Sequence, residues 1–488
     1  MKAQKRNRFW ELHSLLGISL GLPLFIIFVA GTLAFFAPES VNWTNPEFKG
    51  AEDPQAGLEA AVSDLLAKHP DADEFSVVLA TPQRPVTDLY LEENGEFPHY
   101  WLDPATGELS EATPHDSDLF HFFVDLHYFE FIPNGIQLAG LIAALFFAII
   151  LTGLVYQWRT MGRDLQLRNL SLQGKSRWKR IHRFTSLLTL PFQVAYSVTG
   201  AALALGLFLA APTVSVFFDG DQEALNAVLF PEHTAQAPPV ADEPLFPVGA
   251  ALAKAQETWG PEVAPQIVHI AGREATEERP ASRTIMVEGK SQGLYFVGNH
   301  VMTMDENLEV LHAHTPTSHL GPMLIEALVN VHFASFNGFF IKIIFALFGL
   351  IVALSIGAGI YILLQRRPEA SRLTRFLRVL THWQLGGLPL ACAASLLAVQ
   401  LAPDSPLLVF WVVYLLSLVV AVFWKKSLFI SCLSAAILFL LLPAVFALAH
   451  GESPLPLGTP HAWMISFFNV FFLLIGSSLL LLLRRRAG

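Results

Sequence analysis

Four histidines occupy repeated positions between residues 13 and 332 of this 488-residue chain. His13 and His182 each follow a tryptophan and basic residues, and each precedes a long apolar run. His127 and His332 each lie shortly before another apolar run. An ionisable residue in or beside a membrane helix commonly has a functional role. The alternative for any one of them is an interfacial histidine at a helix end, where imidazole is tolerated.

Two imidazoles that face each other across a helix bundle suit haem b, whose axial ligands hold an iron used for electron transfer. Two-fold related helices would bring His13 opposite His182, and His127 opposite His332. Zinc takes four ligands in structural sites, and neither pair has an obvious third and fourth. The histidines therefore predict two haems b, one near each membrane face. Spans of about 20–25 residues would separate the two histidine levels by roughly 30–35 Å of helix.

An internal duplication supports this pairing. In each half a glycine, Gly31 or Gly200, follows the first histidine by 18 residues. A tyrosine, Tyr156 or Tyr361, follows the second histidine by 29 residues. Each half therefore consists of a helix, an outer domain and a second helix. One histidine is predicted at the inner end of the first helix, and the other at the outer end of the second. Two parallel copies of such a unit predict a pseudo-two-fold axis along the membrane normal.

The elements that must position these histidines are membrane helices. Hydrophobic residues make up 53% of the chain and charged residues only 15%, against about 25% in soluble proteins. This composition excludes a nucleic-acid-binding protein and an ordinary soluble enzyme. The two cysteines, Cys392 and Cys432, both lie in apolar runs, so neither a disulfide scaffold nor a c-type haem attachment motif is present.

Eight apolar runs are long enough to span a bilayer, which takes about 20 helical residues. They are residues 14–36, 138–156, 184–212, 343–364, 383–403, 405–424, 427–449 and 462–483. If both termini are inside, the inner segments carry 22 of the 31 Lys and Arg residues but only 3 of the 41 acids. The positive-inside rule therefore favours cytoplasmic termini.

The predicted fold is thus an α-helical membrane protein with eight spans: a four-helix haem core from the repeat, plus four extra helices. Amphipathic segments at 55–69 and 247–259, each followed by strand-like alternation, predict a small α+β domain in each large outer loop. The predicted parts are 1–36 with span one, 37–134 as outer domain one, 135–212 with spans two and three and the loop between them, 213–337 as outer domain two, 338–365 with span four, and 366–488 as a C-terminal four-helix module.

Other residues are weaker candidates. Five basic residues lie where propionates of the inner haem would emerge: Arg8, Arg159, Lys179, Arg180 and Arg183. The positive-inside rule alone also explains basic residues there. His312, His314 and His319 could hold a metal or line a substrate approach, or be solvated loop residues. The longest inner loop is under 30 residues, too short for a nicotinamide or flavin domain. Electrons would therefore come from a separate inner protein, a carrier or membrane quinol.

These residues resemble the PepSY-associated transmembrane family of iron-regulated bacterial inner-membrane proteins. The resemblance covers about residues 8–365 and rests on Leu12-His13, Asp103-Pro-Ala-Thr-Gly107, Leu126-His127 and Ile181-His182-Arg183. It implies two PepSY-like domains in the periplasm and a di-haem reductase that releases iron from ferric siderophores. Carried over, His13 and His182 would ligate the inner haem, and His127 and His332 the outer one.

The net charge of −10 averages over two faces. Outside the inner segments the chain holds 9 basic and 38 acidic residues, so the outer face is anionic and the inner face cationic. A cationic inner face suits anionic lipid or an acidic donor protein. An anionic outer face would favour neutral or cationic ferric chelates over strongly anionic ones.

Two other functions remain open from the sequence. The chain could be a non-catalytic membrane protein whose PepSY-like domains bind or restrain a periplasmic partner such as a protease. It could also be a transporter that uses spans five to eight. Those spans hold almost no ionisable residues, whereas substrate and ion pathways usually need them.

Overall fold

The computed structural model describes residues 3–69, 72, 74–113, 118–166, 176–230, 247–273, 282–291, 296–316 and 320–484. Within these residues, seven helices are long and apolar enough to cross a membrane. They are α1 (Ala3–Ala34), α5 (Gly135–Gln157), α12 (Phe339–Gln365), the continuous helix of α13 (Arg372–His382), η5 (Trp383–Gly387) and α14 (Leu388–Leu401), α15 (Pro406–Phe423), α16 (Ser427–His450) and α17 (Pro460–Arg484). Each one overlaps an apolar run predicted from the sequence, with ends that differ by a few residues.

The run at 184–212, predicted as one span, forms two helices. α7 (Arg177–Leu188) and α8 (Leu190–Phe217) meet at an angle of 67°. Pro191 is the second residue of α8. It has no N–H to donate to the carbonyl one turn earlier and disfavours a helical residue before it, so the helix breaks here. Counting the bent pair as one span raises the number of candidate spans to eight.

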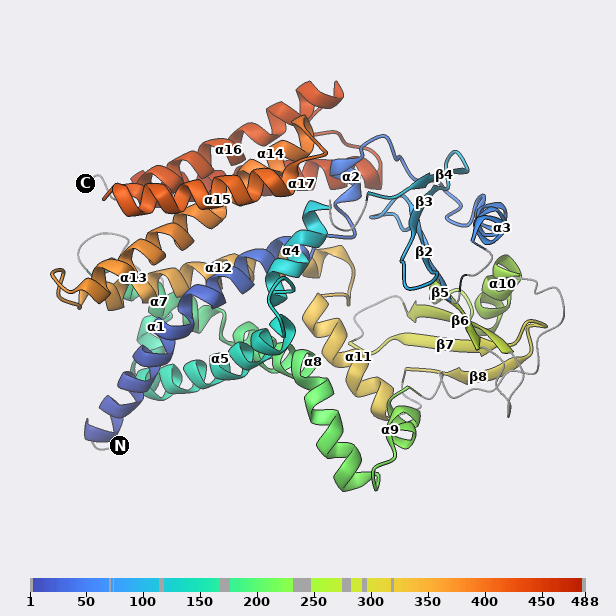
Figure 1. Cartoon of the computed structure of the whole chain (residues 1–488), viewed down its shortest axis with the longest axis horizontal. Helices are drawn as coiled ribbons and strands as arrows, with labels where there is room; N and C mark the ends of the chain where they lie inside the picture. The colour runs from blue at the N-terminus through green and yellow to red at the C-terminus, as the bar shows by residue number, and fades with distance from the viewer. Residues whose placement is uncertain are drawn as a thin grey trace.

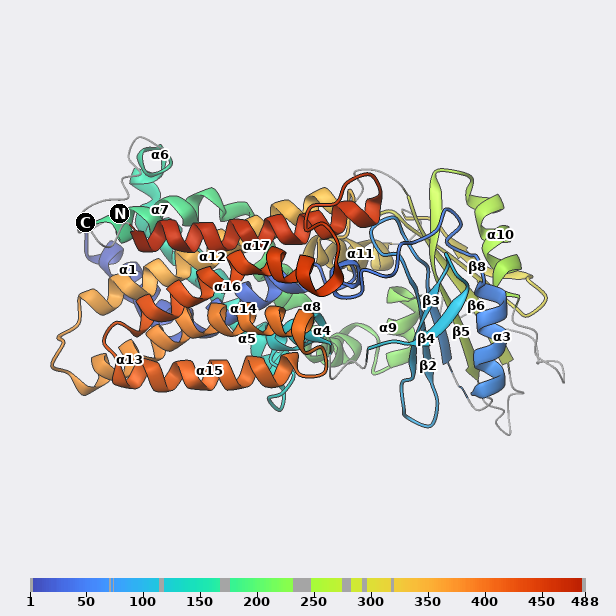
Figure 2. The same ribbon diagram turned by 90° about the horizontal axis from the view of Figure 1, so that it is seen from above.

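The long helices form a bundle, and the strands form a separate layer at one end of it (Figures 1 and 2). Two short helices, α4 (Leu119–Tyr128) and α11 (Leu320–Phe333), lie between the two parts. Each leads into the next long helix, α4 into α5 and α11 into α12, through tight turns with positive-φ residues such as Phe129 (φ 63°) and Ala334 (φ 51°). His127 and His332 lie on these short helices and not, as predicted, at the ends of the long ones.

The strands form one eight-stranded antiparallel sheet, in the order β4-β3-β2-β1-β5-β6-β7-β8. The first outer region supplies β1 (Glu74–Val78), β2 (Thr87–Glu92), β3 (His99–Asp103) and β4 (Glu108–Glu111), and the second supplies β5 (Val263–Arg273), β6 (Ser282–Ser291), β7 (Asn299–Met304) and β8 (Val310–His314). The sequence predicted two α+β domains. Their strands join because β1 pairs with β5, from Glu74 opposite Ala271 to Val78 opposite Ile267.

The sheet has one apolar face and one polar face. α3 (Leu58–Lys68) and α10 (Val248–Trp259) pack with alternate strand residues such as Leu89, Leu91 and Val268 in one buried core. Both helices lie on the side away from the bundle (Figures 1 and 2). The strand residues that alternate with these buried ones, such as Asp88 and Tyr90 on β2, belong to the opposite face because successive side chains of a strand point to opposite sides.

The Asp103-Pro-Ala-Thr-Gly107 motif is the turn between β3 and β4. The Asp103 carboxylate accepts hydrogen bonds from the Ala105 N–H at 2.9 Å and the Thr106 hydroxyl at 3.0 Å. Gly107 takes a φ of 75°, a conformation that costs glycine little. In the second half Asp305 accepts from two backbone N–H groups, and Leu308 takes the left-handed conformation (φ 63°). The second half thus forms a comparable turn without the sequence motif.

The C-terminal helices pack into the same core as the repeat. α2 (Val41–Thr44) places Trp43, which is fully buried, among Phe446, Phe468 and Phe472. The Trp43 indole N–H donates to Asn469 Oδ1 at 3.1 Å. The segment after α1 is therefore anchored in α16 and α17.

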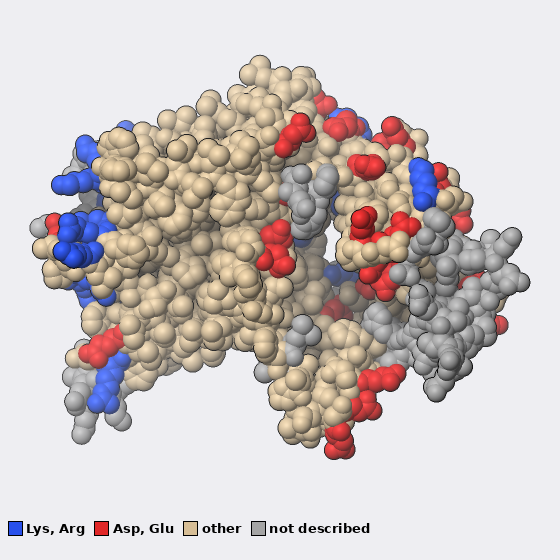
Figure 3. Space-filling view, in the orientation of Figure 1, with Lys and Arg blue, Asp and Glu red and all other residues tan. Residues whose placement is uncertain are grey.

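The charges are separated along the molecule. Lys and Arg side chains gather at the end where both chain termini lie, and Asp and Glu side chains gather around the sheet (Figure 3). An almost uncharged belt of helix surface separates them (Figure 3). We call these two ends the basic end and the sheet end.

Candidate haem sites

His13 and His182 face each other near the basic end. Their ring centroids are 6.1 Å apart. Each ring donates its Nδ1 hydrogen to a backbone carbonyl of the other long helix in its own repeat. His13 Nδ1 lies 3.0 Å from the Ile149 oxygen on α5, and His182 Nδ1 lies 2.9 Å from the Ser355 oxygen on α12.

His127 and His332 form an equivalent pair near the sheet end, with ring centroids 6.0 Å apart. His127 Nδ1 donates to the Ile27 carbonyl on α1 at 2.8 Å. His332 Nδ1 donates to the Thr199 hydroxyl oxygen on α8 at 3.0 Å, and that hydroxyl in turn donates to the Ala195 carbonyl at 2.8 Å. The structure thus brings together all four residues in the two pairs that the sequence predicted.

Each ring rests against a glycine, and at three of the four glycines an added side chain would crowd the ring. A Cβ on Gly31 would lie 2.6 Å from His127, and one on Gly153 would lie 2.9 Å from His13. The corresponding distances are 3.1 Å from Gly359 to His182 and 3.4 Å from Gly200 to His332. Gly31 and Gly200 are the repeated glycines of the sequence. Gly153 and Gly359 were missed, although both lie just before the repeated tyrosines.

This arrangement fits two imidazoles on opposite sides of one metal ion. With Nδ1 occupied as a donor, Nε2 keeps its lone pair for a metal, which is how ligating histidines are usually oriented. Metal–nitrogen distances of about 2.0–2.1 Å place the centroids of two opposed imidazoles about 6.4 Å apart. Both observed separations are close to this value. Among the described residues, no group of three or more His, Cys, Asp or Glu side chains could hold a metal ion, which does not favour zinc.

A cavity surrounds each pair. The sheet-end cavity has a volume of about 530 Å³ and is lined mainly by apolar side chains together with Tyr128 and Tyr196. The basic-end cavity is tighter, at about 180 Å³. Leu24 and Phe146 line both cavities, so one layer of side chains separates the two candidate sites.

The two pairs are closer together than predicted. On α1, His13 belongs to the first pair, and the second pair contacts the helix at Ile27 and Gly31. At a rise of 1.5 Å per residue these positions lie about 21–27 Å from His13 along the helix, against the predicted 30–35 Å. The difference arises because α4 and α11 carry their histidines back along the bundle.

Positive side chains border both cavities. Arg183, Lys179 and Arg366 line the basic-end cavity, and Arg183 also pairs with Asp164 at 2.6 Å. Of the five basic residues predicted near the propionates, Lys179 and Arg183 line this cavity. The other three, Arg8, Arg159 and Arg180, are not among its lining residues.

Two of these positive residues were missed in the sequence. Arg366 contacts the Trp10 ring, with its guanidinium carbon 5.3 Å from the ring centroid. Its position as the first basic residue after span four was a usable signal. Lys342 lines the sheet-end cavity and pairs with Glu39 at 2.6 Å. No sequence signal identified this pair, whose partners are 303 residues apart.

The weaker histidine candidates lie elsewhere. His312 and His314 are on β8, the edge strand of the second half, with ring centroids 5.8 Å apart. His319 lies outside the described residues. Neither His312 nor His314 lines a cavity with the four paired histidines.

The fold and the comparisons define the class of protein. The chain is a multi-pass membrane protein in which a duplicated helical unit carries two facing histidine pairs. A model of the PepSY-associated TM region matches residues 10–366, most of the chain. The protein therefore belongs to the PepSY-associated transmembrane family. The matched region contains all four histidines and ends just after α12, so α13–α17 lie beyond it. A search of the curated proteins finds no match.

Proposed function

We propose that this protein is a di-haem b reductase that passes electrons along the bundle to ferric siderophores at its sheet end. The observation that carries the proposal is the geometry of the histidine pairs. Both pairs have ring separations suited to one metal ion, with every Nδ1 already engaged as a donor. Because the two cavities share Leu24 and Phe146, two haems would be close enough for direct electron exchange.

The residues of the chain would hold and shield the haems. Each haem b, when bound, supplies an iron that accepts and releases one electron. The carbonyl and hydroxyl partners fix the imidazole tautomer and its orientation, and the glycines leave room for the rings. Apolar walls exclude water from the irons. Arg183, Lys179 and Arg366 would offer positive charge to the propionates at the basic end.

The charge separation supports an orientation in the membrane. With the basic end in the cytoplasm, both termini are cytoplasmic and the sheet domain is periplasmic. The bent α7–α8 pair then counts as one span, which gives eight spans in the bacterial inner membrane. Electrons would enter at the basic end from a cytoplasmic protein or membrane quinol. They would leave at the sheet end, where one electron converts ferric to ferrous iron in the siderophore.

The test is a visible spectrum and a haem count on the purified full chain. We expect low-spin b-type bands on reduction and about two haems per chain, as four axial histidines require. His13→Ala and His182→Ala should each remove the haem at the basic end, and His127→Ala and His332→Ala the haem at the sheet end. His450→Ala is a matched control, because His450 lies in the bundle but bonds to Gln400.

Two results would overturn the proposal. One is a folded protein without haem even when it is produced with excess haem, which would favour the non-catalytic, partner-binding function. The other is a haem count that the four paired-histidine variants leave unchanged.

A further inference from the structure

A third cavity lies between the polar face of the sheet and the helices. Its volume is about 880 Å³, the largest of the three described. Its walls come from four parts of the chain: the segment after α1, strands β2–β4, the start of α4, and the α14–α15 loop. We call it the acidic cavity.

The acidic cavity adjoins the sheet-end cavity. Pro38 lines both of them. α4 also connects them, because His121 lines the acidic cavity and His127 lines the sheet-end cavity. Six residues of helix correspond to about 9 Å. A molecule in the acidic cavity would therefore lie next to the haem that we propose at His127 and His332.

Aromatic side chains form one wall of the acidic cavity. Tyr90 stacks on His99 with centroids 4.1 Å apart and planes 13° from parallel. Trp101 lies edge to face with Phe48 at 5.7 Å. Such a wall suits the apolar arms of a chelate of several hundred daltons, and the volume lies within the range of about 300–1,000 Å³ typical of ligand pockets.

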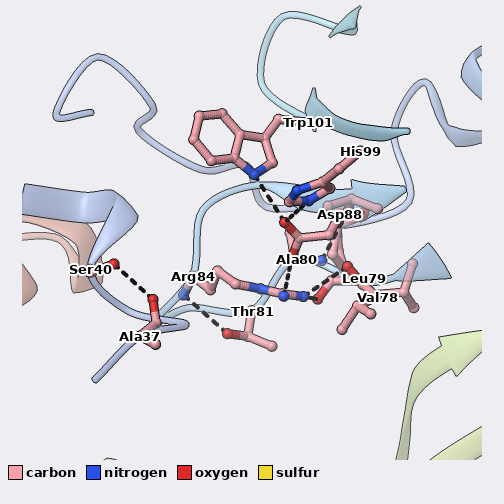
Figure 4. Close-up of polar contacts among 12 residues, drawn as sticks. Ala37, Ser40, Val78, Leu79, Ala80, Thr81, Arg84, Asp88, His99 and Trp101 are labelled. Carbon is pink, nitrogen blue, oxygen red and sulfur yellow. Dashed lines mark hydrogen bonds and ion pairs between the residues drawn. The ribbon is translucent and has the colours of Figure 1, made fainter. Parts of the chain in front are cut away.

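A buried ion pair holds this wall in place. Asp88 pairs with Arg84 and accepts hydrogen bonds from His99 at 3.1 Å and from the Trp101 indole at 3.0 Å (Figure 4). The Arg84 guanidinium also donates to two backbone carbonyls, Val78 and Leu79 (Figure 4). With its charge neutralised in this way, Arg84 leaves no excess positive charge on the wall.

The remaining charge of the cavity is negative. Among the described residues that line it, Arg84 is the only Lys or Arg, whereas the acids are Glu47, Asp88, Glu108, Glu111, Asp118 and Asp404. Figure 3 shows Asp and Glu side chains on both sides of a hollow between the helices and the sheet. A strongly anionic ligand would be repelled here, and a neutral or cationic one attracted.

We propose that the acidic cavity binds the ferric chelate that this protein reduces, and that it selects neutral or cationic chelates. The inference rests on the proposed reductase function. A reduced haem held by His127 and His332 would give one electron to the chelated iron, which would go from ferric to ferrous while the haem is oxidised. No covalent bond would be broken in this transfer. The donor at the basic end, a quinol or a cytoplasmic electron-transfer protein, would reduce the haem again.

The proposal also gives the C-terminal module a role. Pro403 and Asp404, in the loop between α14 and α15, line the cavity with Val399 and Pro406. These residues lie beyond the part of the chain that matches the family. The module would therefore shape the chelate site of this protein.

The experiment uses the full haem-loaded chain, reduced with dithionite without excess and mixed anaerobically with ferric chelates. Haem reoxidation is followed by stopped-flow absorbance. The probes are a cationic ferric trihydroxamate, an anionic ferric tris-catecholate and ferricyanide, which is small enough to need no cavity. The variants are Glu111→Lys and Asp404→Lys for charge, and Ser110→Trp to fill the cavity. Glu257→Lys on the exposed side of α10 is the control with the same change in net charge.

We expect the cationic chelate to reoxidise the wild-type protein faster than the anionic one. Each charge variant should slow the cationic chelate about tenfold and narrow this preference, while Glu257→Lys should not. Ser110→Trp should slow both chelates and leave ferricyanide unchanged. An unchanged haem spectrum shows that each variant has folded.

The experiment gives different results if the acidic cavity is not the chelate site and if the protein is not a ferric-chelate reductase. Chelates that reoxidise all variants and the wild type at equal rates would overturn the site but leave the reductase intact. A reduced haem that no ferric chelate reoxidises would instead overturn the proposed function.

Discussion

The glycines that face the four histidines differ in how closely they approach the imidazole rings. Single glycine-to-alanine substitutions can therefore test the proposed haem sites. A Cβ at Gly31 would lie 2.6 Å from His127 Nδ1, the atom that donates to the Ile27 carbonyl. An ordinary contact needs at least 3.4 Å, so in Gly31→Ala the ring must move by about 0.8 Å. Gly200 faces the partner ring of the same cavity, but its Cβ would already lie 3.4 Å from His332.

The structure sets the size of the expected effect. Displacing the His127 ring forfeits a buried hydrogen bond, worth about 1–3 kcal/mol. Such a loss corresponds to a decrease of about 10- to 100-fold in metal affinity, the usual result of disturbing the partner of a metal-ligating histidine. Gly200→Ala should change haem affinity less than about threefold, because its methyl group makes only an ordinary contact.

The assay is haem transfer from each purified variant to excess apomyoglobin, with the reduced spectrum recorded before and after. Gly31→Ala should release one of its two haems faster, while Gly200→Ala should behave like the wild type. Both variants replace glycine with alanine inside a helix next to the same cavity, so general effects on the bundle cancel. Equal release from both variants, or two tightly held haems in Gly31→Ala, would refute the role of close ring packing.

Three further substitutions test other parts of the structure. Thr199→Val removes the acceptor of His332 Nδ1 and should lower the affinity for the sheet-end haem about 10-fold or more. Thr199→Ser keeps the hydroxyl and should not, and haem transfer to apomyoglobin measures the affinity of both variants. Burial favours neutral His121, but its hydrogen bond and ion pair with Asp118 outweigh burial and raise the His121 pKa above 6.5. The contribution of this pair to the free energy of unfolding is therefore fully present below pH 6.5 and is lost as the pH rises through the raised pKa. The loss is about 1.4 kcal/mol for each pKa unit by which the folded protein exceeds the unfolded one. Asp118→Asn keeps a good helix N-cap and should flatten this pH dependence in thermal unfolding; an unchanged profile would refute the pairing. Trp43→Ala should lower the free energy of unfolding by about 3–5 kcal/mol and expose the segment around α2 to protease, whereas Trp463→Ala, at a residue 57% exposed, should not; equal effects would contradict the anchoring role of α2.

Local pattern predicted the helices, the repeat and the histidine pairs, because apolar runs, prolines and repeated spacings are properties of contiguous residues. The bend before Pro191 follows from proline chemistry but was not predicted. The union of β1 with β5 could not be read from the sequence, because it pairs strands about 190 residues apart. The same holds for α4 and α11, whose positions depend on the bundle against which they pack.

The candidate site, like the fold, was predicted only in part from the sequence. Histidine identity and spacing indicated the two histidine pairs, whereas the Nδ1 acceptors and two of the four glycines became visible only in three dimensions. Asp404 and Asp118 are ordinary loop and cap acids in the sequence. Only folding brings them, with Tyr90 and Trp101, around one cavity.

The central claim is that electrons cross the membrane through both histidine pairs. Proteoliposomes can test it, with a cationic ferric trihydroxamate and an impermeant colorimetric ferrous chelator trapped inside and an impermeant reductant added outside. We predict that coloured ferrous complex forms inside vesicles with the wild-type protein, and that His13→Ala or His127→Ala abolishes it. Absence of internal ferrous complex with haem-loaded wild-type protein, or undiminished formation with either variant, would contradict the account.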